Sequence, residues 1–163
     1  MFTSVRRLAG PAICVLLVLG AVAHPAFAQT YQASPSTITL DIYQGQNGVG
    51  TEASSAMGGL PSVSCKGATV SLDLGSTWQI YRGNGFAYVQ YESDLMPSWT
   101  SIVTQGETES GSVWPPYPYS GIAVSVSNLS TLQFRIYLVA GVGGGGYVLG
   151  SATLENVSVT PKH

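Results

Sequence analysis

The sequence is poor in cysteine, histidine and charged residues. Its 163 residues include two cysteines and two histidines, and only 9% of the residues are charged. Cys14 and His24 lie within a predicted secretory leader, so only Cys65 and His163 remain beyond it. A zinc site of the usual ligands needs more than these two side chains, and a serine or cysteine nucleophile normally needs a neighbouring histidine. We therefore expect neither a zinc site nor a catalytic triad. Cys65 has no partner for an intramolecular disulfide, and we expect it to be buried.

Residues 1–28 have the pattern of a cleavable secretory signal. Two arginines precede an apolar run from Ile13 to Ala23, and the small residues Ala26 and Ala28 follow it, as signal peptidase requires. The apolar run has 11 residues, whereas a membrane-spanning helix needs about 20. We predict cleavage after Ala28, a secreted or periplasmic protein without membrane insertion of the mature chain, and a single domain over residues 29–163.

Positive charge is scarce in the predicted mature chain. Four basic and eight acidic residues leave a net charge of −4. The basic residues, which form no cluster in the sequence, are Lys66, Arg82, Arg135 and Lys162. Nucleic acids and anionic membrane surfaces bind to concentrated positive charge. We therefore expect neither of them as a partner.

Carboxylates are the catalytic groups that remain available. A glycosidase needs two of them about 5–9 Å apart, and neighbours on one face of a strand lie about 6.5–7 Å apart. A carboxylate-dependent hydrolase is therefore a less favoured alternative, because acids spaced in this way beside turns are usually solvated. Calcium would also need several of these oxygens, but no D-x-D-x-D ligand run is present. We predict no catalytic residue, no metal ion and no cofactor. The acidic residues considered are Asp41, Asp73, Glu92, Asp94, Glu107 and Glu109.

Apolar and polar residues alternate along most of the mature chain, as in half-buried β-strands. The segments 37–43, 69–74 and 121–127 follow this pattern, and a change of parity at Glu155-Asn156 predicts a β-bulge. The clearest strand, 131–139, places on one face Leu132, Phe134, Ile136 and Leu138. We predict an all-β fold, an antiparallel two-sheet β-sandwich that is jelly-roll-like or, alternatively, immunoglobulin-like.

The Asn84-Gly85 pair predicts a β-hairpin between residues 77–82 and 86–92, because Asn-Gly favours a type I′ turn. In this hairpin Tyr81 would pair with Tyr88. One face would belong to the core and contain Trp78, Ile80, Ala87, Val89 and Tyr91.

Three further segments are predicted as loops. Residues 44–62 form a long loop with at most one short strand, and residues 105–120 form a loop that ends in an aromatic, proline-rich run. Residues 141–146 match the G-x-G-x-x-G pattern, but no helix follows to present its amides to a phosphate. We interpret this glycine run as a flexible hairpin loop.

Aromatic side chains are the strongest indication of a ligand. Aromatic rings can stack on the apolar faces of sugars, while amides and carboxylates hydrogen-bond the sugar hydroxyls. Tyrosine pairs also stabilise hairpins by about 0.2–1 kcal/mol, so a structural role stays open. The predicted ligand-binding residues are Gln79, Tyr81, Tyr88, Gln90, Trp114, Tyr117 and Tyr119.

The segment from Tyr147 to Val159 resembles the last strand of carbohydrate-binding jelly rolls, which often end in an acidic-Asn-Val-x-Val pattern, here Glu155 to Val159. The resemblance implies a jelly-roll fold and assigns no binding residue. We predict an exported, non-enzymatic β-sandwich that binds a glycan or another cell-surface ligand through exposed aromatic side chains. The alternative is a structural or adhesive surface protein that acts by self-assembly as a homo-oligomer.

Overall fold

The computed structural model describes residues 28–108 and 112–163, so the predicted leader up to residue 27 and Glu109 lie outside the described residues. The described residues form seven strands and one short 3-10 helix, and the strands pair antiparallel in one sheet. The predicted all-β antiparallel fold is confirmed. The elements are β1 (Tyr31–Gln32), β2 (Thr37–Gln44), β3 (Thr51–Met57), β4 (Ala68–Glu92), β5 (Thr100–Glu107), β6 (Val113–Val124), η1 (Leu129–Thr131) and β7 (Gln133–Pro161).

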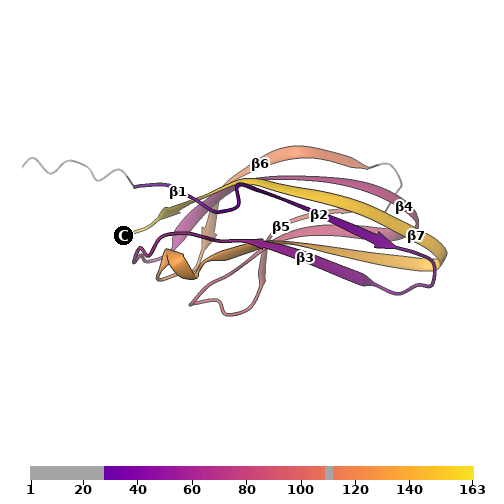
Figure 1. Ribbon diagram of the computed structural model, residues 1–163, viewed down its shortest axis with the longest axis horizontal. Helices are drawn as coiled ribbons and strands as arrows, with labels where there is room; N and C mark the ends of the chain where they lie inside the picture. Colours follow the sequence, from indigo (N-terminus) through magenta and orange to yellow (C-terminus); the bar gives the residue numbers. More distant parts are fainter. Residues whose placement is uncertain (1–27, 109–111) are drawn as a thin grey trace, which may run out of the picture.

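Two very long strands, β4 and β7, organise the sheet. They pair antiparallel along nearly their whole length. Both strands bend at the same end of the molecule, so that one half of each strand runs back beneath its other half (Figure 1). The bend lies where the register shifts between Tyr81, paired with Tyr147, and Gly83, paired with Val142. Arg82 of β4 is therefore opposed by residues 143–146 of β7, and these glycines give β7 its longer path around the bend.

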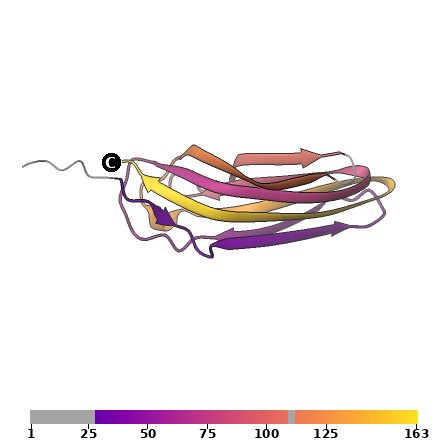
Figure 2. The same ribbon diagram turned by 90° about the horizontal axis from the view of Figure 1, so that it is seen from above.

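The bend divides the folded sheet into two layers, which lie one above the other in Figure 1, and Figure 2 looks onto the first of them from above. In the first layer, β2 and β6 flank residues 147–161 of β7 and residues 68–81 of β4. In the second layer, β3 and β5 flank residues 133–142 of β7 and residues 83–92 of β4. This arrangement is consistent with a β-sandwich, but the described strands are hydrogen-bonded into one folded sheet because β4 and β7 run through both layers.

The core lies between the layers and contains the inward residues that alternation predicts. Leu132, Phe134, Ile136 and Leu138 are all fully buried, and so are Val70, Leu72 and Leu74. The buried Trp78 lies against two glycines, Gly150 of its own layer and Gly85 of the second layer. A Cβ atom at either glycine would overlap the indole ring. The absence of side chains at these positions therefore allows the layers to close around Trp78.

The predicted hairpin at Asn84-Gly85 is wrong, because the two halves of β4 do not pair with each other: the strand is continuous through these residues and stays paired with β7 on both sides of the bend. Tyr81 pairs with Tyr147, whereas Tyr88 pairs with Tyr137 and Thr104. The predicted core face is nevertheless buried, since alternation continues on both sides of the bend. Gly85 provides space for the Trp78 ring rather than a positive φ for a tight turn.

Strands occupy residues in all three of the segments predicted as loops. The glycine run is not a hairpin loop but part of β7, at its bend, and the aromatic, proline-rich run lies in β6. The long segment after residue 44 contains β3, as the prediction allowed. The predicted bulge is confirmed: Asn156 has a φ of 54°, and the pairing of β4 with β7 shifts register beside it.

A buried polar contact also joins the layers. Gln105 of β5 accepts a hydrogen bond from the Ser76 hydroxyl (3.0 Å) and donates one to the Leu74 carbonyl (3.3 Å), both in β4. Cys65, which the sequence predicts to be buried, is only half-buried, and its thiol contacts the carbonyl of Val126. No helix in the described part of the chain is long and apolar enough to cross a membrane.

Candidate functional site

The outer face of the first layer is built from cross-strand rows of side chains. One row runs from Asp41 on β2 through Ser151 on β7 and Thr77 on β4 to Val113 on β6. The next row toward the bend contains Tyr43, Leu149 and Gln79. On β2, β4 and β7 these side chains point away from the core because each alternates along its strand with a buried neighbour.

Two adjoining hollows lie on this face and together form what we call the groove. The first has a volume of about 470 Å³, and the second has a volume of about 280 Å³. Both are open to solvent and share Thr77, Val113 and Ser151. The side chains of the groove that can hydrogen-bond a ligand are Asp41, Thr77, Gln79, Ser151, Thr153 and Glu155.

Strand β6 supplies one wall of the groove. Its pairing with β4 is interrupted between Leu74 and Ser76, where residues 115 and 116 bulge out opposite Gly75. A Cβ atom on Gly75 would lie 3.1 Å from the Pro116 nitrogen and 3.2 Å from the Trp114 carbonyl oxygen. Glycine at this position therefore lets the proline bulge approach the sheet and places Trp114 in the wall.

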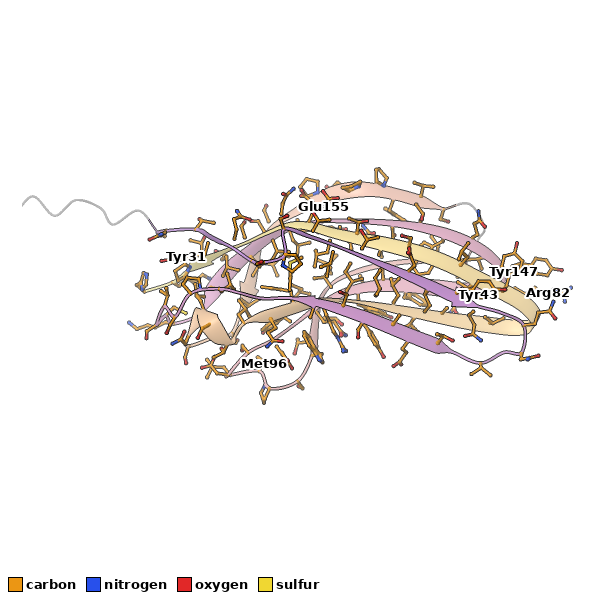
Figure 3. The ribbon with its side chains drawn as sticks, in the orientation of Figure 1. Tyr31, Tyr43, Arg82, Met96, Tyr147 and Glu155 are labelled. Carbon is orange, nitrogen blue, oxygen red and sulfur yellow. The ribbon has the colours of Figure 1, made fainter. Side chains whose placement is uncertain are left out.

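Exposed tyrosines continue the face from the groove to the bend. Tyr81 and Tyr147 are cross-strand partners with ring centroids 6.0 Å apart, and 49% of the Tyr81 surface is exposed. Tyr43 and Tyr147 lie at the same end of the molecule as Arg82 (Figure 3). This face therefore combines a polar groove with aromatic rings that are accessible to a ligand.

The outer face of the second layer is different, because its aromatic side chains pack on one another. Phe86, Tyr88 and Tyr137 form a continuous series of ring contacts. The guanidinium carbon of Arg135 lies 4.4 Å from the Tyr137 ring and 4.4 Å from the Trp99 ring. A hydrogen bond to Glu52 raises the pKa of Tyr137, and desolvation adds to this shift.

Gln90 belongs to this second face, and its amide already has partners. Its Oε1 accepts a hydrogen bond from Arg135 Nε (2.8 Å), and its Nε2 donates one to the Ser101 hydroxyl (3.0 Å). Tyr88 and Gln90 therefore do not share a surface with Gln79 and Tyr81. A tight hairpin would place Gln79, Tyr81, Tyr88 and Gln90 on one face, but the bend at Arg82 divides these predicted ligand-binding residues between the two layers.

The predicted aromatic residues of β6 occupy three different environments. Trp114 lines the groove, whereas Tyr117 is exposed on this edge strand. Tyr117 contacts Tyr119 edge-on, with centroids 5.2 Å apart. The Tyr119 hydroxyl accepts a hydrogen bond from the buried Gln105, at 3.2 Å. Tyr119 therefore takes part in the contact between the layers.

The acidic residues considered from sequence are dispersed. Asp73 accepts a hydrogen bond from Asn156, and Asp94 binds Ser127 and Thr131. These contacts lower the pKa of Asp94 to about 2, with the Ser127 hydroxyl as the largest cause. Within the described ranges, no group of three or more His, Cys, Asp and Glu side chains could hold a metal ion. Glu107 ends β5, and Glu92 ends β4.

Several residues of the groove and of the exposed face beside it were absent from the sequence prediction. Tyr147, Leu149, Ser151, Thr153 and Glu155 alternate with buried residues along β7, so their outward parity was a usable signal. Their position beside Gln79 depends on pairing between β4 and β7, which lie far apart in the sequence. Local alternation cannot supply that pairing.

No protein-family model and no curated protein matches the sequence. Among solved structures, the chain is similar to one reported as the structure of infectious bursal disease virus Gx strain, with a TM-score of 0.35 and 11% sequence identity. The match covers 80% of this chain and 35% of the other, so this chain spans about a third of that protein's length.

Proposed function

We propose that this protein is exported and binds a carbohydrate chain in the groove on the outer face of the first layer, without catalysing a reaction. The observation that carries the proposal is the composition of this one face. Hydroxyl, amide and carboxylate side chains line two adjoining hollows, and Trp114, Tyr81 and Tyr147 border them with aromatic surface.

This composition matches the surface chemistry of a sugar. Sugar rings present apolar C–H faces, which pack against aromatic side chains, and equatorial hydroxyls, which both donate and accept hydrogen bonds. The Gln79 amide offers both a donor and an acceptor, the Asp41 carboxylate offers acceptors, and the Ser151 hydroxyl offers either. An open groove along a strand also suits a chain of sugars better than a single small molecule.

A matched pair of glutamine variants tests the proposal. Gln79→Ala removes an amide from the groove, and Gln133→Ala removes another exposed glutamine, at the start of β7 in the second layer. We expect Gln79→Ala to weaken the affinity for the bound glycan about 3- to 10-fold, as for the loss of one hydrogen bond. The measurement is a glycan array followed by titration calorimetry of each hit.

The control should retain the wild-type affinity, and circular dichroism should show both variants folded. Failure of every glycan on the array to bind would refute the proposal. Equal affinities for Gln79→Ala and wild type would also count against the groove as the binding site.

Self-assembly is the second candidate, and the same face favours it. Tyr43, Val113, Tyr147 and Leu149 expose apolar surface there, and contiguous exposed apolar surface is typical of protein contacts. Strand pairing through β6 is disfavoured because this edge carries three prolines, which lack the amide that a ladder needs. Light scattering across a range of concentrations distinguishes the candidates, since assembly predicts oligomers that Leu149→Ser disrupts.

A further inference from the structure

Arg82 stands apart from the other basic residues of the predicted mature chain. Lys66 and Lys162 lie together at the opposite end, where the Lys66 amide donates to the Lys162 carbonyl. Arg135 is held on the second face between Trp99 and Tyr137. Arg82 is thus the one of these four cations at the bend, where the exposed tyrosines lie (Figure 3).

The Arg82 side chain is placed beside the aromatic surface and keeps most of its donors free. Its guanidinium carbon lies 5.2 Å from the centre of the Tyr81 ring, and one terminal nitrogen makes a long contact of 3.5 Å with the Gly144 carbonyl. Among residues 28–108 and 112–163, no acidic side chain forms an ion pair with it. A guanidinium presents five N–H donors in a planar fork that matches a carboxylate.

The backbone of Arg82 supplies an independent argument. Its φ is 52°, in the left-handed region that glycine and asparagine adopt most easily. The glycines of β7 approach its backbone closely at the bend, since a Cβ atom at Gly143 or Gly146 would lie 2.8 or 2.6 Å from the Arg82 carbonyl oxygen. If residue 82 served only to form the bend, glycine would suit this backbone conformation better than arginine does. An unfavourable backbone conformation at a long, charged side chain is typical of a functional site.

We propose that the glycan bound by the groove carries a carboxylated sugar, such as a uronic acid, and that Arg82 pairs with its carboxylate at the bend end of the face. This inference rests on the proposed function and specifies its ligand. The occupant is a chain with an isolated carboxylate rather than a densely charged polyanion. Asp41 and Glu155 line the same groove, and they would repel a polyanion along its length.

Oligosaccharides in matched forms test this inference. Xylose-, galactose- and N-acetylglucosamine-based oligosaccharides are each prepared neutral, with one glucuronate, and with the methyl ester of that glucuronate. The ester keeps the shape of the acid but removes its charge. We expect at least one acid form to bind the wild-type protein about ten-fold more tightly than its own ester, a preference that weakens as salt is added.

Three substitutions test whether that preference belongs to Arg82. Arg82→Gly suits the left-handed backbone and should fold at least as well as wild type, while its affinity for the acid falls to that for the ester. Lys66→Gln removes one positive charge at the opposite end and should keep the ten-fold preference. Arg82→Lys keeps the charge but loses the planar fork, and it should retain only part of the preference.

The outcomes separate the two proposals. Binding of acid and ester with equal affinity would overturn the role of Arg82 and leave carbohydrate binding standing. A preference that survives in Arg82→Gly would also overturn it. If no form binds, both proposals fail, and tighter binding of a heavily sulfated chain than of any single-carboxylate glycan would overturn the stated ligand class.

Discussion

Replacing Gly150 with alanine tests whether the Trp78 ring fills the space between the two layers so tightly that no methyl group can be added there. The indole ring is 1% exposed and lies between Gly150 and Gly85, which belong to different layers. A Cβ atom at Gly150 would lie 2.9 Å from Cη2 of the ring and closer still to two other ring atoms. The ring cannot move toward the second layer, because Gly85 already contacts its other side.

The expected loss of stability follows from the confinement of the indole ring between the two glycines. Overpacking a well-packed core typically costs about 1–3 kcal/mol. Because both sides of the ring are backbone, we expect Gly150→Ala to lower the free energy of unfolding by about 3 kcal/mol. This is a large part of the total, since a domain of this size is stabilised by about 5–15 kcal/mol.

Urea denaturation followed by circular dichroism measures the change, with Gly144→Ala as the matched control. Gly144 lies in the same strand, and a Cβ atom there would meet nothing within 4 Å. Its φ is outside the left-handed region, so alanine should leave stability unchanged or raise it by up to about 1 kcal/mol.

A double-mutant cycle identifies the contact. Trp78→Leu removes the ring atoms that the new methyl group would meet, so Gly150→Ala should cost far less in that background, with a coupling of about 1–3 kcal/mol. The argument is refuted if Gly150→Ala stays within about 0.5 kcal/mol of wild type. It is equally refuted if its cost is the same with leucine at position 78.

Two further predictions concern polar contacts. The pKa of Asp94 is about 2, below its ordinary value of 3.8; the stability that this carboxylate contributes is therefore present above about pH 4 and lost as the pH falls toward 2. The difference in urea midpoint between wild type and Asp94→Asn should accordingly shrink over that range, and a constant difference would contradict the assignment. Gln105→Leu leaves the buried Ser76 hydroxyl without its partner and should cost about 1–3 kcal/mol in urea denaturation. Adding Ser76→Ala should recover part of that loss, and no recovery would argue against the contact.

Alternation within short segments was enough to predict several strands and their buried faces, although it missed the aromatic part of β6 and the bend of β7. The inward residues Phe134 and Ile136, and likewise Val70 and Leu72, follow directly from a period of two, because successive side chains on a strand point to opposite faces. The bulge at Asn156 follows from the same rule, as a change of parity. These features depend on neighbours in the sequence alone.

The path of β4 through Asn84-Gly85 depends instead on distant residues. A glycine suits either a tight turn or the close approach of another group, and at Gly85 the Trp78 ring and the pairing with Ala140 of β7 decide between them. That choice separates Tyr81 from Tyr88 and brings Tyr147 beside Tyr81, which creates the groove face. Pairing across more than 50 residues is a tertiary interaction, so no local pattern contains it.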